Sequence, residues 1–373
     1  MKITDVTSEL FEWDKPPIWN GKHYYSVGRL HKVTVYTDEG ITGVGWNGGT
    51  AAERPLNFFP NYVEYYKTLL KDENPLETKS LVDRFGTQQI KILGPGGLHT
   101  QVLAAINIAC WDIKGKVLGK SIHSLLGGNK KRIPTYIAGG YYAEDKGISE
   151  LKDELLYNVE ILHAKAVKIK IGDPNYGLKN DMKRVEAARN AIGDNIGLMV
   201  DANCALSLEQ AMEFSKELAN YDVYWFEEPL PIHDYEGHNK LKKKSTMNIA
   251  TGENGYHLEH FKNLTTNDCA SIFNVDVAIC PGYDVALEIS QMAMLNNISI
   301  APHGCQELQL PLVAGIENGE FLEYYPKEVD PLRSEMFQPI LKPDKDGYVT
   351  VSEKPGLGYD LNMNLLKKHQ VFD

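Results

Sequence analysis

From about residue 133 onward, short apolar runs alternate with longer amphipathic segments, and this rhythm constrains the fold more than any other feature. The segments between the runs, such as 181–193 ("DMKRVEAARNAIG"), have helical length and periodicity. Repeated strand-then-helix units indicate parallel strands joined by helical crossovers. The predicted strands are 133–138, 166–172, 196–203, 223–229, 248–254, 271–278, 298–304 and 320–325.

Eight such units that close on themselves predict an α/β fold of the modified TIM-barrel type, (β/α)7β, with its site at the carboxyl ends of the strands. An open doubly wound sheet is the alternative. The first 130 residues instead predict a separate α+β unit. They contain a hairpin with its turn at 38–40, a helical segment at 57–70, and a longer helix expected to run on to the glycines at 127–128. We therefore expect three parts: 1–130, a barrel at 131–325, and a tail at 326–373 that returns to the first unit.

Composition excludes several classes of function. The net charge of −11 argues against a nucleic-acid surface, which needs a basic footprint. No stretch approaches 18 uninterrupted apolar residues, so we expect no membrane span. The five cysteines are odd in number and scattered, which predicts free thiols in a reducing cytoplasm.

Ionisable residues follow the apolar runs of all predicted strands after the first. Taken singly, each of these residues could be the first residue of a loop or a helix N-cap. Two lysines on one strand are likewise typical of an edge strand whose lysines face solvent. The complete series favours a shared site, because the strand ends of a barrel converge over one mouth. In chain order its members are Lys168, Lys170, Asp201, Glu227, Glu253, Asp276, His303 and Glu323.

Three acidic residues of the series predict a metal site. Asp201, Glu227 and Glu253 end consecutive strands, and their charges would repel one another strongly unless a cation lay between them. Hard oxygen ligands in this number suit Mg²⁺.

The lysines and the histidine predict two bases on opposite sides of that metal. Lys168 and the cation together would lower the pKa of Lys170, so that Lys170 accepts a proton near neutral pH. Asp276 is placed to hydrogen-bond an imidazole nitrogen of His303 and raise its basicity. Such a pair suits removal of a proton from the carbon next to a carboxylate, with the metal stabilising the resulting enediolate.

These motifs resemble the enolase superfamily, specifically its mandelate racemase subgroup (the mandelate racemase/muconate lactonizing enzyme family), over nearly the whole chain. The resemblance is carried by "KIKIG", "VDAN", "WFEEPLPIHDYEGH", "TGEN", "WDIKGK", the Asp276–His303 pair and the glutamate of "FLE". It implies that residues 1–130 form a capping domain, that the cofactor is Mg²⁺ and that the protein is a homo-oligomer. It further implies that Glu323 hydrogen-bonds the substrate carboxylate, with Asn203 and Glu228 supporting the metal ligands.

The resemblance also narrows the reaction. Where the racemase has a serine near the end of the first barrel strand, this chain has Gly140, which disfavours racemisation of an aryl 2-hydroxy acid. We expect Mg²⁺-dependent dehydration of an acid sugar to a 2-keto-3-deoxy acid. The alternatives are a racemase or epimerase of a 2-hydroxy or amino acid and, in another class, a non-catalytic binding protein. The substrate is expected to meet capping loops at 16–29 and 45–54, with side chains such as Trp19, Tyr24, Tyr25 and Arg29.

Overall fold

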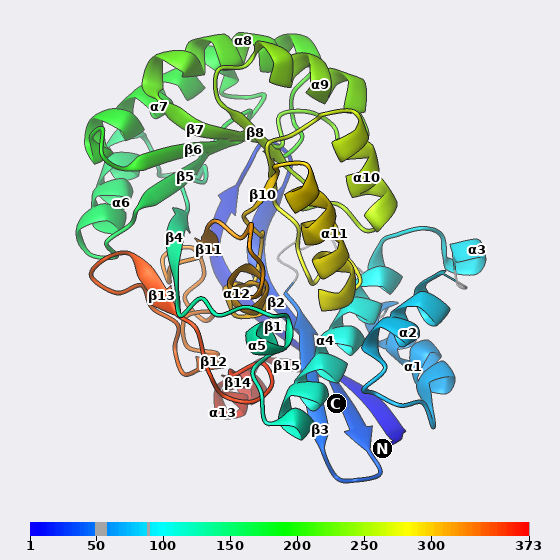
Figure 1. The fold of residues 1–373 in the computed structure, drawn as a ribbon. Helices are drawn as coiled ribbons and strands as arrows, with labels where there is room; N and C mark the ends of the chain where they lie inside the picture. Colours follow the sequence, from blue (N-terminus) through cyan, green and yellow to red (C-terminus); the bar gives the residue numbers. More distant parts are fainter. Residues whose placement is uncertain (49–57, 88–89, 373) are drawn as a thin grey trace.

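The N-terminal part is an antiparallel sheet covered by helices (Figure 1). The computed structural model describes residues 1–48, 58–87 and 90–372. The sheet has the order β15-β1-β2-β3, with β1 (Ile3–Trp19), β2 (Tyr24–Thr37), β3 (Thr42–Asn47) and β15 (Gln370–Phe372). The predicted hairpin is therefore confirmed as β2 and β3, with Gly40 in a positive-φ conformation in the turn.

Six helical segments accompany this sheet. They are α1 (Phe58–Leu70), α2 (Thr78–Val82), a π-helix (Asp83–Thr87), α3 (Ile90–Leu93), α4 (Leu98–Leu118) and α5 (Ile122–Leu125). The helix α4 packs closely on β3, where a Cβ on Gly45 would lie 2.0 Å from the Ala105 carbonyl oxygen. The prediction that this helix runs on to the glycines at 127–128 is wrong. It ends at Leu118, because Gly119 adopts the left-handed conformation (φ 62°) that terminates a helix.

The second part is a ring of eight parallel strands. They are β4 (Arg132–Ala138), β5 (Ala166–Lys170), β6 (Gly197–Asp201), β7 (Val223–Glu227), β8 (Asn248–Thr251), β9 (Ile272–Phe273), β10 (Ser299–Ile300) and β11 (Leu322–Tyr324). Their order is β10-β9-β8-β7-β6-β5-β4-β11. The Ile300 amide donates to the Asn318 carbonyl, and the Glu320 amide donates to the Ile300 carbonyl, both at 2.9 Å. These bonds join the two ends of the sheet, so the modified barrel is confirmed over the open sheet.

Seven helices connect the strands and pack around the outside of the ring (Figure 1). They are α6 (Ile148–Glu160), α7 (Gly177–Ile192), α8 (Leu208–Leu218), α9 (Tyr235–Lys244), α10 (Leu258–Thr266), α11 (Tyr283–Leu295) and α12 (Gln306–Gly315). Inside the ring the side chains of Tyr136, Met199 and Trp225 are fully buried, and the rings of Tyr136 and Trp225 meet edge to face at 5.0 Å. The interior is thus a packed core that supports the strand ends from below.

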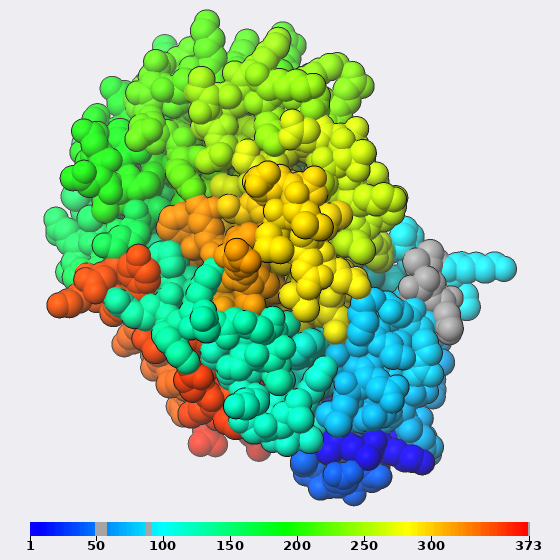
Figure 2. All heavy atoms as spheres, in the orientation of Figure 1, coloured from blue at the N-terminus to red at the C-terminus, as the bar shows by residue number. Residues whose placement is uncertain are grey.

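The tail touches both parts. It contains β12 (Phe337–Gln338), β13 (Tyr348–Thr350), β14 (Asp360–Leu361), α13 (Met363–Leu366) and a 3-10 turn (Lys367–His369) before β15. The strand β13 pairs with β4 of the barrel, and β15 pairs with β1 of the N-terminal sheet. The space-filling view shows the N-terminal part (blue to cyan) packed against the barrel (green to orange) (Figure 2). The division at residues 130 and 325 stays a prediction. Among the helices that the structure describes, none has the length and hydropathy of a membrane span.

Candidate active site

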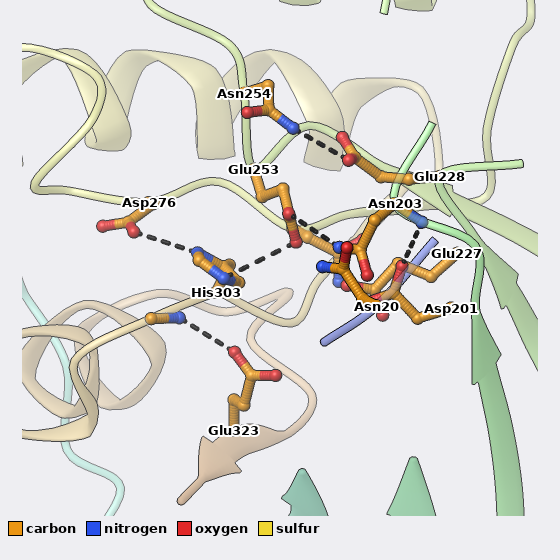
Figure 3. A network of polar contacts seen from close by, with 12 residues as sticks. Asn20, Asp201, Asn203, Glu227, Glu228, Glu253, Asn254, Asp276, His303 and Glu323 are labelled. Carbon is orange, nitrogen blue, oxygen red and sulfur yellow. Dashed lines mark hydrogen bonds and ion pairs between the residues drawn. The ribbon is translucent and has the colours of Figure 1, made fainter. Parts of the chain in front are cut away.

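Strand pairing brings the predicted residues together at the barrel mouth. In the parallel register Lys170 lies beside Asp201, and Asp201 lies beside Glu227. Glu253 lies two residues after the end of β8, and its side chain points toward Asp201 and Glu227 (Figure 3). Neighbouring strands therefore place a lysine and three carboxylates side by side, as the series of strand ends predicts.

The three carboxylates form a cluster that fits a divalent cation. Asp201 and Glu227 are fully buried, and one oxygen of each carboxylate lies within 4.8 Å of the others. Burial and the charge of Asp201, against the opposing charge of Lys168, raise the pKa of Glu227 to about 8. The Oε2 atom of Glu253 accepts no hydrogen bond from the described residues. An all-oxygen donor set with crowded negative charge and a spare oxygen suits Mg²⁺.

The two lysines are held by these carboxylates. Lys168 Nζ lies 2.8 Å from both Glu227 Oε1 and Glu323 Oε1, and its side chain is fully buried. Lys170 Nζ lies 2.5 Å from Asp201 Oδ2. Burial lowers the pKa of Lys170, but the charges of Asp201, Tyr141 and Glu253 together outweigh burial, so the pKa is raised overall; the charge of Lys168 acts in the lowering direction. The sequence argument identified the effect of Lys168 but not the larger, opposite effect of Asp201.

A histidine–aspartate pair lies beside the carboxylate cluster, next to Glu253 (Figure 3), whereas Lys170 contacts the cluster at Asp201. His303 Nδ1 is 3.0 Å from Asp276 Oδ2, and His303 Nε2 is 3.6 Å from Glu253 Oε2. Burial lowers the pKa of His303, but Glu253, Asp276 and Glu323 together outweigh burial and raise it to about 10. Asp276 Oδ1 accepts hydrogen bonds from Gln309 Nε2 (2.7 Å) and the Ala278 amide (2.8 Å), which fixes the carboxylate against the imidazole.

Further polar residues brace the cluster. Asn203 Nδ2 donates to Glu253 Oε1 at 3.3 Å, and the Asn203 amide donates to Asp201 Oδ1 at 2.8 Å. Glu228 Oε2 accepts from Asn254 Nδ2 at 2.8 Å (Figure 3). Both Asn203 and Glu228 have positive φ (44° and 40°), a conformation that costs energy outside glycine. The amide of Gly304, next to His303, donates to Glu323 Oε2 at 2.9 Å.

A cavity of about 510 Å³ opens onto this cluster, within the range of small-molecule sites. Its wall includes Lys170, Asn203, Glu228, Glu253, Asp276 and His303. Other members of the wall come from the N-terminal part, the ends of β4 and β11, and the tail: Lys15, Ile18, Lys22, His23, Tyr25, Asn47, Tyr141, Tyr325, Asp330 and Arg333. All three parts of the chain therefore contribute to the wall of the cavity.

Of the predicted loop side chains, the structure places Tyr25 in the cavity wall. The other three predicted side chains are not among the described residues that line it. The Trp19 indole donates to Asp173 Oδ2 at 2.7 Å, Tyr24 is 54% exposed, and Arg29 Nε pairs with Glu12 at 2.7 Å. Of the second predicted loop, residues 49–54 lie outside the described residues.

The end of β4 meets the cavity through Tyr141. The preceding Gly140 has φ 59° and donates its amide to Glu154 Oε1 at 2.6 Å, and a Cβ on this residue would lie only 2.5 Å from Ile169 Cβ. Tyr141 and three other wall residues, Lys15, Tyr325 and Arg333, were missed by the sequence argument. Tyr325 directly follows β11, and Tyr141 comes three residues after the end of β4. Both could have been predicted from their places at strand ends if aromatic as well as charged residues had been considered.

The fold and site define a barrel protein of the enolase type, with an acidic cluster between a lysine and a histidine. Comparison with known families agrees. Residues 151–365 match the family "Enolase C-terminal domain-like", and residues 6–127 match "Mandelate racemase / muconate lactonizing enzyme, N-terminal domain". The chain belongs to the mandelate racemase/muconate lactonizing enzyme family of the enolase superfamily.

Curated relatives include sugar-acid enzymes. The chain is 30% identical over 291 residues to an arabinonate dehydratase of Saccharolobus solfataricus, covering 77% of this chain and 74% of that protein. It is 31% identical over 281 residues to a 3,6-anhydro-alpha-L-galactonate cycloisomerase of Streptomyces coelicolor, covering 74% of each.

A solved structure agrees over almost the whole chain. It is a racemase of Streptomyces coelicolor with bound magnesium, with a TM-score of 0.90, 25% identity, and coverage of 99% of this chain and 100% of that one.

Proposed function

We propose that this protein is a Mg²⁺-dependent lyase that dehydrates an acid sugar to a 2-keto-3-deoxy acid. The observation that carries the proposal is the placement of two proton-transfer groups around one acidic cluster. Lys170 contacts the cluster at Asp201, and His303 faces it at Glu253. A protein that only binds its ligand has no use for two such groups, so the arrangement supports an enzyme over the binding-protein alternative.

Asp201, Glu227 and Glu253 would hold the Mg²⁺. When bound, the cation supplies positive charge that stabilises negative charge developing on the substrate carboxylate. It also offsets the charge of Asp201, the main cause of the raised pKa of Lys170. We therefore propose that Lys170 works as a base only in the metal-loaded protein, with Lys168 favouring its neutral form. The bound magnesium of the Streptomyces coelicolor racemase supports this metal assignment.

The remaining roles follow from the contacts. Lys170 Nζ accepts the α-proton, leaving an enediolate. His303, protonated and held by Asp276, donates its Nε2 proton to the β-hydroxyl as the C–O bond breaks, so that water leaves and the enol product becomes the 2-keto acid. The family resemblance supports a contact between Glu323 and the substrate carboxyl group. Glu323 is fully buried behind the cavity wall and held by Lys168 and the Gly304 amide. Against burial, the charges of Lys168 and His303 lower its pKa to about 2, so a hydrogen bond to a carboxylate would require one of the two groups to take up a proton.

The alternative is a racemase or epimerase that uses the same two groups. In that case His303 would return a proton to the α-carbon on the opposite face instead of expelling water. The structural match to the Streptomyces coelicolor racemase supports this alternative, whereas the arabinonate dehydratase relative supports the lyase.

Incubation of the Mg²⁺-loaded protein with a library of acid sugars in D₂O separates the reactions. NMR should show a 2-keto-3-deoxy acid with at least one substrate. Deuterium at the α-carbon with no loss of water would establish the racemase or epimerase instead. Absence of both across aldonates and aldarates would contradict the proposed lyase. The Lys170→Ala variant should lose product formation while keeping Mg²⁺ binding, and normal turnover by it would refute the assignment of the base.

We also propose a cytoplasmic homo-oligomer. All five cysteines are free and buried, as suits a reducing compartment. The oligomer rests on the family resemblance alone, and sedimentation of the purified protein tests it: a monomer at micromolar concentration would contradict it.

A further inference from the structure

Three cations of the cavity wall, Lys15, Lys22 and Arg333, form no ion pair with the described residues; Lys22 is exposed to solvent, whereas Lys15 is buried and Arg333 partly buried. Lys15, on β1, is only 8% exposed, and its Nζ lies 5.4 Å from the centre of the Tyr25 ring. Arg333, in the tail, lies 5.1 Å from the centre of the Tyr325 ring, and its buried Nε makes no hydrogen bond. Within the described residues, neither side chain forms an ion pair at 4.0 Å or less.

Acidic groups lie near these two cations but do not pair with them. Against the effect of burial, Cys305, Glu307 and Asp330 raise the pKa of Arg333, yet neither carboxylate comes within 4.0 Å of it. Asp330 acts on both, but its Oδ1 accepts from the Trp13 indole (2.9 Å) and the Arg333 amide (3.3 Å). Glu307, beside Arg333, is buried, and burial raises its pKa. Burial and the nearby charge of Arg333 lower the pKa of Lys15, with Asp330 opposing them. Buried or partly buried cations without an ion-pair partner are costly in free energy, and an anion in the cavity would reduce that cost.

The two cations lie apart from the acidic cluster. Lys170 Nζ is 5.1 Å from the centre of the Tyr141 ring, and the Tyr141 and Tyr25 rings are 6.1 Å apart. Lys15 in turn lies over the Tyr25 ring. The charges that act on Lys15 are those of Asp330 and Arg333, and no carboxylate of the acidic cluster is among them, so Lys15 and Arg333 share a part of the wall outside that cluster.

We infer that the substrate carries a second anionic group at the end remote from its α-proton, and that Lys15 and Arg333 bind this group. This deepens, and rests on, the proposed function: the substrate class becomes a sugar acid with a terminal carboxylate or phosphate in place of a terminal hydroxyl. The guanidinium of Arg333 suits either group, because its planar donors match both in bidentate geometry.

The test compares three substrates of one sugar configuration: the aldarate, the aldonate, and the aldonate phosphorylated at its terminal hydroxyl. With the Mg²⁺-loaded protein, kcat/KM should be at least about tenfold higher for one of the two dianionic compounds than for the aldonate, as a charge-assisted hydrogen bond provides. A preference for the aldarate would identify the second anionic group as a carboxylate, and a preference for the phosphorylated aldonate would identify it as a phosphate. Equal values for all three would overturn the inference without any variant.

Variants of Arg333 and Lys15 test whether these two residues cause the preference for the dianionic substrate. Arg333→Gln and Lys15→Met should each raise KM for the dianionic substrate. The ratio of kcat/KM for the dianionic substrate to kcat/KM for the aldonate should therefore fall toward one. Lys114→Met is a matched control, because Lys114 also lies over an aromatic ring (Trp111, 4.6 Å) but lies outside the cavity wall. A ratio that is unchanged in both cavity variants, or that falls equally in the control, would overturn the assignment.

Calorimetric titration separates this inference from the proposed reaction. If no product forms but the dianionic compound binds more tightly, and Arg333→Gln removes the difference, the second anion site stands and the lyase is refuted. If the aldarate, the phosphorylated aldonate and the aldonate all react with equal affinity and rate, the lyase stands and the second anion site is refuted.

Discussion

Replacing Asp276 by asparagine tests how His303 is held. Asp276 Oδ1 faces two donors, Gln309 Nε2 and the Ala278 amide, and Oδ2 faces His303 Nδ1. In Asp276→Asn the remaining carbonyl oxygen must stay opposite the two donors. The new NH₂ group then points at His303 Nδ1, which has to accept, so the single proton of the neutral ring moves to Nε2.

This tautomer disables His303 in either direction of proton transfer. Its Nε2 has no lone pair to accept a proton, and releasing the Nε2 proton would leave an imidazolate. The variant also loses the carboxylate charge that helps to raise the pKa of His303. We expect kcat to fall about 10³- to 10⁴-fold, as in another enzyme with a carboxylate–histidine pair. That corresponds to about 4 to 5.5 kcal/mol of transition-state stabilisation.

The assay is formation of the 2-keto acid, followed together with α-proton exchange in D₂O. Product should fall by the stated factor while exchange through Lys170 persists. Gln309→Leu is the matched control, because it removes one donor to Asp276 but keeps the charge, and it should cost no more than about tenfold in kcat. If Asp276→Asn keeps more than a tenth of the parent kcat while remaining folded, the tautomer argument is refuted.

Three other perturbations test the site and its surroundings. Mg²⁺ at 100 times its Kd should stabilise the parent protein by about 2.7 kcal/mol; Glu253→Gln should lose this gain in thermal unfolding, and a full gain would contradict the metal assignment. Lys170→Met should bind Mg²⁺ at least as tightly as the parent, because it removes the cation 2.5 Å from Asp201, and weaker binding by calorimetry would count against the arrangement. Asp181, which accepts a hydrogen bond from the Tyr142 hydroxyl, has its pKa raised by burial to about 6. Its stabilising contribution is therefore present below pH 4 and lost as the pH rises through 6, so Asp181→Asn should gain up to about 3 kcal/mol relative to the parent between pH 4 and pH 7. Denaturant unfolding at both values measures this difference, and a constant difference would refute it.

The barrel was predictable because strand and helix alternate strongly in this part of the sequence. The same argument located Asp276 and His303, although β9 and β10 are only two residues long, because both residues follow an apolar run. Helix boundaries were less predictable. A continuous apolar pattern spans α4 and α5, but the left-handed conformation of Gly119 ends α4 and separates the two helices. A single glycine in the sequence is not enough to predict such an end.

The cavity wall was only partly predictable, because neighbouring residues of a strand point their side chains to opposite faces of the sheet. Tyr24 and Tyr25 are adjacent on β2, and alternation sends one to solvent and the other to the cavity. Lys15 and Arg333 come from β1 and the tail, which converge on the mouth only through long-range packing. No periodicity near either residue marks it as part of a site.

The contacts of Lys168 give it a role that differs from the one predicted from the sequence. From the sequence, Lys168 serves to lower the pKa of Lys170 through like charge. In the structure it is fully buried, forms ion pairs at 2.8 Å with both Glu227 and Glu323, and is absent from the cavity wall. It thus ties a proposed metal ligand to the glutamate proposed to meet the substrate carboxyl group. Because breaking a buried pair leaves an uncompensated charge, its removal should disorder both carboxylates as well as alter Lys170. Its positioning role follows from contacts, whereas its electrostatic role follows from charge alone.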